Sequence, residues 1–373
     1  MARTRQIAIL AGERSGDVHA GRLASELKRL DPSLAFWGIG GELMQQAGVD
    51  IIFDTTHHVP IGLMGVPRAI RRQYGLMMHI VWRVQHERPA AVILVDYPDF
   101  NLRVAARIQR IGVPVFYFIS PQLWAWRSHR IERIKKHVHK VYCFFDFEKE
   151  MYDRHGVDSE WIGHPLVQVM DSEAGGDLRK ELAIPPDKLL VAVLPGSRKC
   201  EFRLIAPVLL KAVEMARADL DLAAVMSRAP AVTDEMVARV DASNVHVVVG
   251  RTRDILRAAD VALVASGTTT LEAAALLTPM IVAYRTSPVT YYALSHLLEI
   301  SNLALPNIVA GRRIVPEFIQ RKATPETIAR ELVSLIRDGK TGVMKEELRK
   351  VREKLGPPGA INRAAASILE FLA

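Results

Sequence analysis

The chain contains the stretch Val193-Leu-Pro-Gly-Ser-Arg198 and, 68 residues further on, the stretch Ser266-Gly-Thr-Thr-Thr-Leu-Glu272. Each stretch closes an apolar run, turns through glycine and small hydroxylated residues, and continues with a helical pattern. A turn of this kind directs unpaired backbone N–H groups and a helix N-terminus at one point, which suits a phosphate or diphosphate. The pair of turns in the C-terminal half therefore predicts a nucleoside diphosphate site. The alternative is that both turns only connect strands to helices.

The residues around these turns have matching chemistry. Arg198 supplies a cation with forked donors, and Glu272 supplies a carboxylate that can accept both hydroxyls of a ribose. Leaving-group charge would then be balanced by Arg198 and the helix N-termini. The turn residues assigned to this site are Gly196, Ser197, Ser266, Gly267, Thr268 and Thr269.

Short apolar runs alternate with helical patterns along the whole chain. Continuous apolar strands separated by helices indicate parallel sheets that are buried on both faces. The expected fold class is α/β, with two Rossmann-like, doubly wound lobes that face a cleft. The strands expected first are 6–11, 34–39, 91–95, 113–119, 141–144 and 160–162, and those expected second are 189–194, 222–226, 245–249, 261–264 and 280–284.

A length of 373 residues exceeds what one compact core normally holds, so two domains are expected. Polar and glycine-rich residues after position 165 mark the hinge. We assign 1–168 to an N-terminal domain and 169–355 to a C-terminal domain that carries the nucleoside diphosphate site. No strand is expected after Tyr284. Gly356-Pro-Pro-Gly359 separates the last helix, 360–372, which is expected to pack back on the N-terminal lobe.

Lys and Arg exceed Asp and Glu by eight, which favours an anionic partner. No nucleic-acid-binding motif accompanies that charge, so nucleic acid is not expected as a partner. The sequence offers no run of about 18 apolar residues for a membrane span. It begins without the pattern of a signal peptide, which indicates a cytoplasmic protein. Cys143 and Cys200 have no metal-binding spacing and are read as packing thiols.

Asp96 directly follows the buried strand expected at 91–95. A carboxylate at the carboxyl end of a central strand is placed for general-base catalysis, and a structural turn residue is the alternative. Asp99 is the competing carboxylate, and we expect it to cap the following helix. The first turn, Ala11-Gly-Glu-Arg-Ser-Gly-Asp17, matches neither a dinucleotide-binding nor a hydrolase motif.

Metal ligands are not expected, because no histidine, cysteine or acidic cluster has a convincing spacing. Asp219 and Asp221 match the D-x-D of some nucleotide-sugar transferases, but they precede a strand instead of following it. We therefore expect neither a metal nor another cofactor.

An apolar, glycine-broken segment begins at Val59 and is followed by arginines. Apolar residues beside cations are typical of a lipid interface, and an interlobe or core segment is the alternative. The expected membrane or acyl contacts are Ile61, Leu63, Met64, Val66, Arg68, Arg71 and Arg72.

In their order and combination, several motifs closely resemble those of lipid-A-disaccharide synthases. They include Gly12-Glu-x-Ser-Gly-Asp17, Val95-Asp-Tyr-Pro-Asp-Phe-Asn101, Pro121-Gln-x-Trp-Ala-Trp-Arg127, Gly163-His-Pro165, Leu194-Pro-Gly-Ser-Arg-x-x-Glu201, Ser266-Gly-Thr-x-Thr-Leu-Glu272 and Pro306-Asn307. Arg14 departs from the small residue or proline that is usual in the family, which affects only the local loop.

The resemblance implies a GT-B glycosyltransferase that inverts configuration without a metal. It implies UDP-2,3-diacylglucosamine as donor and 2,3-diacylglucosamine 1-phosphate (lipid X) as acceptor, with Asp96 as base. It also adds Ser15, Gly16, Gln122, Glu201 and Asn307 to the residues that bind substrate or UDP. The expected location is the inner face of the cytoplasmic membrane, as a peripheral protein on an anionic surface. The oligomeric state is left open.

Two other functions fit parts of the pattern. A UDP-sugar 2-epimerase would share the architecture and the uridine site, but it would need no acyl-binding surface. A non-catalytic lipid- or nucleotide-binding protein would leave Asp96 without a role. Release of UDP that depends on the acceptor would distinguish the three.

Overall fold

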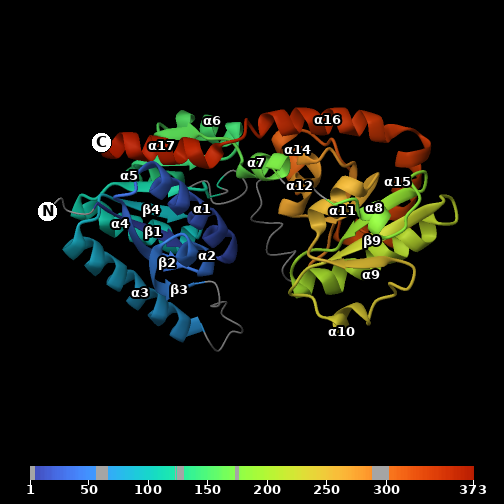
Figure 1. Ribbon diagram of the computed structural model, residues 1–373, viewed down its shortest axis with the longest axis horizontal. Coiled ribbons are helices and arrows are strands. Elements are labelled where there is room, and N and C mark those ends of the chain that lie inside the picture. The colour runs from blue at the N-terminus through green and yellow to red at the C-terminus, as the bar shows by residue number, and fades with distance from the viewer. Residues whose placement is uncertain (1–4, 56–65, 122, 124–129, 173–175, 288–301) are drawn as a thin grey trace. The chain divides into compact units, whose positions relative to one another are not determined.

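The structure is a computed structural model that describes residues 5–55, 66–121, 123, 130–172, 176–287 and 302–373 (Figure 1). The chain divides into two compact units. The first comprises Met1–Pro165 together with Pro357–Ala373, and the second comprises Leu166–Gly356. These divisions lie close to the boundaries expected at 168 and 355.

The N-terminal unit is built on a parallel sheet of seven strands in the order β3-β2-β1-β4-β5-β6-β7. The central strands are buried on both faces; β4, for example, is the uninterrupted apolar run AVILV. The order reverses between β1 and β4, which is the position where doubly wound sheets bind ligands. The strands are β1 Gln6–Ala11, β2 Ala35–Gly40, β3 Val49–Asp54, β4 Ala91–Val95, β5 Val115–Phe118, β6 Lys140–Cys143 and β7 Ser159–Trp161.

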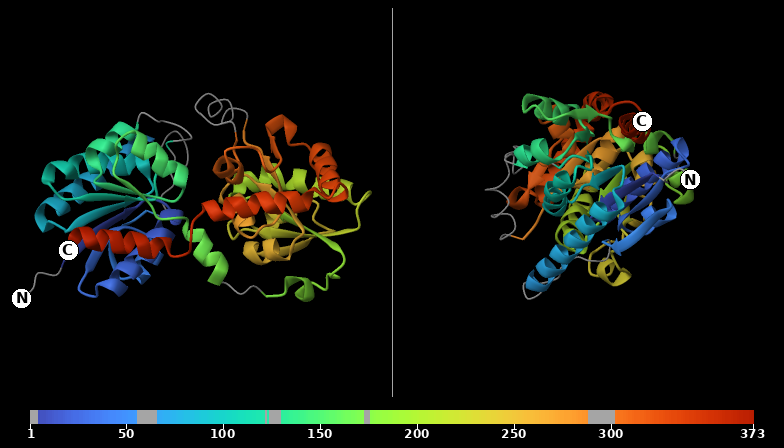
Figure 2. Two further views of the ribbon diagram at one scale, coloured as in Figure 1. Left: turned by 90° about the horizontal axis from the view of Figure 1, so that it is seen from above. Right: turned by 90° about the vertical axis from the view of Figure 1, so that its left-hand side faces the viewer.

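Helices cover both faces of this sheet, as the edge-on view in Figure 2 shows. One face carries α3, α4 and α5, which contact one another in sequence, and the other carries α1 and α17. The helices of the unit are α1 Arg14–Leu30, α2 Glu42–Gln46, α3 Val66–Glu87, α4 Pro98–Ile108 with the 3-10 turn η2 Gln109–Ile111, α5 Ile131–His137, α6 Asp146–Arg154 and α17 Ala360–Leu372.

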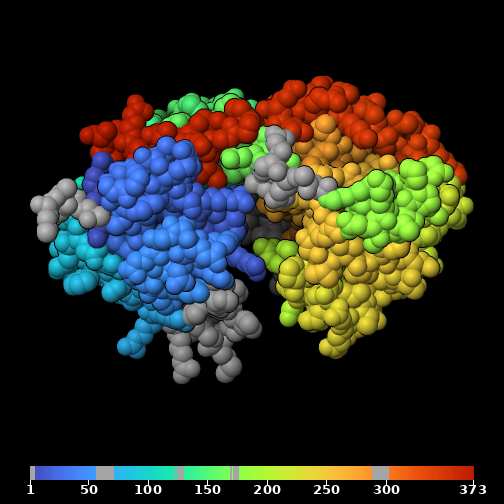
Figure 3. Space-filling model, in the orientation of Figure 1, coloured from blue at the N-terminus to red at the C-terminus, as the bar shows by residue number. Residues whose placement is uncertain are grey.

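The C-terminal helix α17 belongs to the N-terminal unit, where it lies at the surface (Figure 3). Its buried face, with Ala364, Ala365 and Ile368, packs on the unit beside α1. Arg363 donates from Nε and Nη2 to the carbonyl of Ile162, at 3.0 and 2.6 Å. The expected return of this helix to the first lobe is therefore observed.

The second unit repeats the plan with six parallel strands in the order β10-β9-β8-β11-β12-β13. The order reverses between β8 and β11, which pair in register from Val191 and Val261 to Leu194 and Val264. The turns that follow β8 and β11 therefore emerge side by side at the carboxyl edge. The strands are β8 Leu189–Leu194, β9 Leu222–Arg228, β10 His246–Val249, β11 Val261–Ala265, β12 Met280–Tyr284 and β13 Glu317–Ile319.

Helices α9 and α15 pack against each other beside this sheet. Helix α11 contacts β8 and β9, and α12 contacts β11 and β12. The helices of the unit are α8 Leu178–Glu181, α9 Lys199–Ala216, α10 Asp234–Val237, α11 Thr252–Ala258, α12 Thr268–Ala275, α14 Leu305–Ala310, α15 Pro325–Arg337 and α16 Lys340–Lys354, with η4 at Gln320–Lys322; α7, Pro165–Ser172, begins at the junction with the first unit.

Two strands were not expected from the sequence. β3 has aspartates at its second and last positions, so no continuous apolar run marks it. The expectation of no strand after Tyr284 is wrong, because β13 pairs with β12 from Val282 and Glu317 onward. β13 has only three residues and follows a proline, which leaves too little pattern to read.

Candidate active site

Asp96 lies directly after β4, at the switch point of the N-terminal sheet. Its backbone is left-handed, with φ of 49°, and that of Tyr97 is left-handed as well, also with φ of 49°. Consecutive left-handed residues other than glycine are unfavourable and persist only where the surrounding structure enforces them. The chain therefore makes a forced turn at the candidate base.

The environment of the Asp96 carboxyl raises its pKa above the ordinary value for an aspartate. Burial is the largest cause, because it disfavours the charged form, and the nearby Glu13 carboxylate adds to it. The backbone N–H of Tyr97 acts in the opposite direction. A partly desolvated carboxylate with a raised pKa is suited to accept a proton from a hydroxyl.

The turn after β1 adjoins that of Asp96. A Cβ placed on Gly12 would lie 2.0 Å from Cγ of Tyr97, so only glycine lets the Tyr97 ring sit there. Gly16 is buried in the first turns of α1, and a Cβ on it would lie 3.7 Å from the carbonyl oxygen of Val95. Ser15 is exposed at the same helix end. The structure thus brings Ser15 and Gly16 next to the Asp96 turn.

Asp17 closes the same motif and has a structural role. Its carboxylate accepts the backbone N–H groups of Gly41, Leu43 and Met44 at 2.8 to 3.1 Å. It therefore caps α2 from a buried position, with 3% exposure.

The expectation that Asp99 caps α4 is wrong. The helix begins one residue earlier, at Pro98, and its N-cap Tyr97 makes no side-chain capping bond. Asp99 lies in the first turn and forms an ion pair with Arg130. The Asp99 carboxylate is therefore already engaged by an arginine.

In the C-terminal unit, Gly196 has φ of 105° in the turn between β8 and α9. Glu201 folds back over this turn. It accepts from Nη1 of Arg198 at 2.8 Å and from the backbone N–H of Arg198 at 3.3 Å. Ser197 is exposed, and the Arg198 side chain keeps 74% of its surface exposed. Glu201 thus shapes the turn and orients Arg198.

The neighbouring turn, between β11 and α12, leaves the helix N-terminus without a side-chain cap. Gly267 and Thr268 are exposed, and Thr269 is half-buried. The hydroxyl of Ser266 already has a partner within the unit, because it donates to the carbonyl of Leu303 at 3.1 Å. The N–H groups at the start of α12 remain suited to a phosphate.

Glu272, expected to bind ribose, lies one turn further along α12. Its Oε1 is 3.4 Å from Nε of Arg253, which belongs to α11. The Glu272 side chain is 21% exposed. The ion pair fixes the direction of the carboxylate while part of it stays open to solvent.

The expectation that the Asn307 side chain binds substrate or UDP needs correction. Asn307 is fully buried; its amide donates to the carbonyl of Val315 and to Glu317, and its Oδ1 accepts the N–H groups of Ile314 and Val315. Glu317 also accepts the N–H of Leu303 at 2.9 Å, and Leu303 in turn holds Ser266. Asn307 therefore supports the turn after β11 indirectly, through Glu317 and Leu303.

The remaining expected contact residues are only partly described by the structure. Gln122, Ile61, Leu63 and Met64 lie outside the described residues. Val66 and Arg68 are placed in the first turn of α3 by their backbone alone. Arg71 is exposed on α3, and the guanidinium of Arg72 lies 4.9 Å from the centroid of the Phe53 ring.

Asp219 and Asp221 lie before β9, at the opposite edge of the sheet from the two turns. Asp219 pairs with Arg337 at 2.8 Å, and Asp221 pairs with Lys188 at 3.1 Å. Within the described ranges, no three His, Cys, Asp or Glu residues are grouped so as to hold a metal ion.

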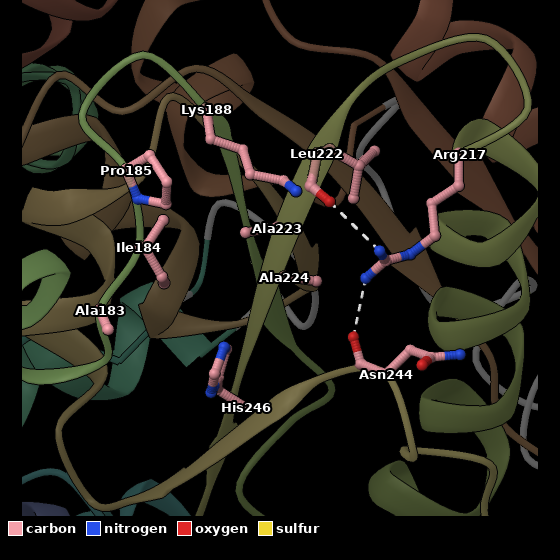
Figure 4. A pocket seen from close by; sticks show the side chains of 10 residues that line it. All are labelled: Ala183, Ile184, Pro185, Lys188, Arg217, Leu222, Ala223, Ala224, Asn244 and His246. Carbon is pink, nitrogen blue, oxygen red and sulfur yellow. Dashed lines mark hydrogen bonds between the residues drawn. The ribbon is translucent and has the colours of Figure 1, made fainter.

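A pocket of about 220 Å³ opens at this amino edge, between the starts of β8, β9 and β10 (Figure 4). Arg217 points into it, but its guanidinium donates to the carbonyls of Leu222 and Asn244 at 3.2 and 2.7 Å. The pocket is therefore separate from the candidate nucleotide turns, and its arginine already has backbone partners.

Some residues near the site were missed by the sequence analysis. Asn101 and Tyr117 both contact the Asp96 backbone. Asn101 ends the motif that begins at Val95, but no role was assigned to it, and Tyr117 is a polar residue in the apolar run of β5. Gln320, at the carboxyl end of β13, has a left-handed backbone with φ of 52° and gave no signal. His19 and His164 flank Phe144, and burial lowers their pKa values to about 4 and about 3, respectively.

Solved structures with this architecture include a putative UDP-N-acetylglucosamine 2-epimerase from Listeria monocytogenes, with a TM-score of 0.66 at 12% identity over 99% of this chain and 97% of that one. The glycotransferase of kitacinnamycin gives a TM-score of 0.66 at 16% identity over all of both chains. The fold defines the class: two Rossmann-like units, as in GT-B glycosyltransferases and the epimerases that share their architecture.

The family model for lipid-A-disaccharide synthetase matches residues 7–370. The lipid-A-disaccharide synthase of Anaeromyxobacter dehalogenans (strain 2CP-C) is 39% identical over 98% of this chain and 97% of its own length. That of Myxococcus xanthus (strain DK1622) is 37% identical over 100% and 99%. The chain belongs to the lipid-A-disaccharide synthase family, and it functions as a hexosyltransferase in lipid A biosynthesis. The epimerase and carrier alternatives are correspondingly disfavoured.

Proposed function

We propose that the enzyme transfers the 2,3-diacylglucosamine unit of UDP-2,3-diacylglucosamine to the 6-hydroxyl of lipid X. The oxygen of that hydroxyl attacks the anomeric carbon and forms the new glycosidic bond, while its proton passes to the Asp96 carboxylate. The bond between the anomeric carbon and the diphosphate breaks, and its electron pair leaves with UDP. Attack opposite to the leaving group inverts the anomeric centre and gives the β-1,6-linked disaccharide 1-phosphate.

The observation that carries this proposal is the desolvated Asp96 carboxyl, whose raised pKa suits a base, at the switch point of the N-terminal sheet. The C-terminal unit supports the nucleotide half of the proposal. There, the glycine turns after β8 and β11 emerge from paired strands, with Arg198 beside one of them. The solved 2-epimerase from Neisseria meningitidis has a related fold and is described as bound to UDP-GlcNAc. Cationic Arg198 and the N–H groups of both turns would stabilise the departing diphosphate without a metal.

The test is turnover of UDP-diacylglucosamine with lipid X, with products identified by mass. Asp96→Asn should fold and bind UDP but lose about 100- to 10,000-fold in turnover, since a positioned base contributes that much. Asp99→Asn is the matched variant, because it removes a carboxylate three residues away that is engaged by Arg130. If Asp96→Asn turns over normally and Asp99→Asn does not, the base is Asp99.

We also propose that the enzyme works as a peripheral protein on the anionic inner face of the cytoplasmic membrane. On α3, Tyr74, Met78 and Trp82 are 55%, 41% and 56% exposed. They recur every fourth residue, so they form one apolar stripe along the helix, opposite a buried face that includes Met77 and Ile80. Tyrosine and tryptophan favour the interface between lipid and water, and the exposed Arg71 near the stripe suits lipid phosphates. In the described part of the chain, no helix is long and apolar enough to cross a bilayer.

Flotation with vesicles that contain anionic lipid tests this second proposal. Replacing Tyr74, Met78 and Trp82 with serine should reduce binding, as should replacing Leu63, Met64 and Val66 with serine. Both variants should raise the apparent KM for lipid X and leave UDP affinity unchanged. Salt should weaken the wild-type association. Undiminished flotation of both folded variants would refute the membrane proposal.

A further inference from the structure

The backbone carbonyl oxygen of Asp96 points toward the core, where two buried side chains donate hydrogen bonds to it and so hold the turn. The hydroxyl of Tyr117 donates to this oxygen at 2.7 Å, and the Nδ2 of Asn101 donates to it at 2.7 Å as well. The two donors come from different elements, because Tyr117 lies in β5 and Asn101 in the first turns of α4. Both residues are completely buried.

Neither donor is explained by packing alone. Tyr117 stands within the apolar core between the sheet and α4, where a buried phenol needs a hydrogen-bond partner. Burial raises the pKa of Tyr117 well above its ordinary value, so the hydroxyl stays protonated and remains a donor. Asn101 also reaches the carbonyls of Leu10 and Val95, each at 3.3 Å. Its amide thus ties together the ends of β1 and β4.

These contacts act on a strained backbone. Asp96 and Tyr97 are both left-handed, a conformation that side chains other than glycine rarely adopt. The outer side of the turn is fixed too: the Tyr97 ring covers Gly12, and its hydroxyl accepts from Nε2 of Gln73 at 2.9 Å. A carbonyl held toward the core fixes the direction of the Cα–Cβ bond of Asp96, and with it the place of the carboxylate.

We propose that Tyr117 and Asn101 are positioning residues for the glycosyl transfer, which hold Asp96 in the strained conformation that its role as base requires. This inference rests on the proposed function of Asp96. It adds two residues that touch no substrate and act through one backbone carbonyl.

Tyr117→Phe is the direct test, because it removes one hydroxyl and preserves the shape of the core. Tyr142→Phe is its matched control: Tyr142 lies buried in the adjacent strand β6, and its hydroxyl bonds to Ser367, away from Asp96. Turnover, the KM for both substrates, the pH profile of kcat and the Tm are measured for each variant with UDP-diacylglucosamine and lipid X.

Tyr117→Phe should lower kcat by roughly 5- to 100-fold with KM little changed. A misplaced base reduces the stabilisation of the transition state more than it reduces the binding of the substrates. Its acid limb should move to lower pH, because a relaxed turn exposes the carboxylate and lowers its pKa toward the ordinary value. Tyr142→Phe should lose a comparable amount of Tm but keep kcat within about twofold. Asn101→Ser, which withdraws the other donor, should reproduce the effect of Tyr117→Phe.

The inference is overturned if Tyr117→Phe and Asn101→Ser match Tyr142→Phe in kcat and in pH profile. Should either of the first two variants fail to fold, the other decides. Asp96→Asn separates this inference from the proposed function. Full turnover in Asp96→Asn would refute the assignment of Asp96 as the base. An inactive Asp96→Asn together with normal turnover in Tyr117→Phe would refute only the positioning role of Tyr117.

Discussion

Gly196→Ala should disrupt the turn after β8 and weaken UDP binding. Gly196 has φ of 105°, which an alanine adopts only under strain. An alanine Cβ would also lie 2.7 Å from Oε2 and 2.8 Å from Cβ of Glu201. The second contact is with an atom next to the backbone, so Glu201 cannot simply swing its end away. Its contacts with the N–H and Nη1 of Arg198 would be lost with the shift.

The structure sets the expected magnitude. Left-handed strain costs about 1–2 kcal/mol for a residue other than glycine. The ion pair between Glu201 and Arg198 adds about 0–1 kcal/mol to stability, because Arg198 is largely exposed. The free energy of unfolding should therefore fall by about 1–3 kcal/mol. UDP affinity should fall separately, by roughly 10- to 150-fold (about 1.5–3 kcal/mol), if a charged contact from Arg198 is lost.

Gly339→Ala is the matched control for this prediction. Gly339 is also left-handed, with φ of 63°, but a Cβ on it would meet no heavy atom within 4 Å. Gly339→Ala should lower the thermal stability because of the same backbone strain, but UDP affinity measured by calorimetry should not change. If both variants lose similar stability and both bind UDP normally, the turn after β8 is not part of the nucleotide site.

Other perturbations test the same site. Arg198→Ala and Glu272→Ala should each weaken UDP binding by about 1.5–3 kcal/mol if each contact is a charged hydrogen bond, and unchanged calorimetric affinity in both would place the nucleotide elsewhere. Turnover should persist in excess EDTA; a loss that magnesium or manganese restores would contradict the metal-free mechanism. Activity should fall as the pH drops through the raised pKa of Asp96, since only the ionised form accepts a proton. Glu13→Gln removes the like charge that helps to raise this pKa, so the acid limb of its pH–rate profile should move to lower pH, and an unmoved limb would show that another group titrates.

Local sequence patterns were sufficient for most of the fold. Buried parallel strands appear as continuous apolar runs, so β1, β4, β8 and β12 were predicted with their observed bounds. The patterns failed where an element is short or mixed, as in β13. A strand of three residues is defined by its pairing with β12 and not by its own composition.

The candidate site divides in the same way. That Asp96 follows a buried strand, and that glycine turns follow two others, are facts of neighbouring residues, and the sequence determined them. Which groups those residues meet depends on the order of strands in the sheet, because that order joins distant parts of the chain. Only the tertiary structure could therefore direct Tyr117 onto the Asp96 carbonyl, pair Glu272 with Arg253, and turn Asn307 inward to Glu317.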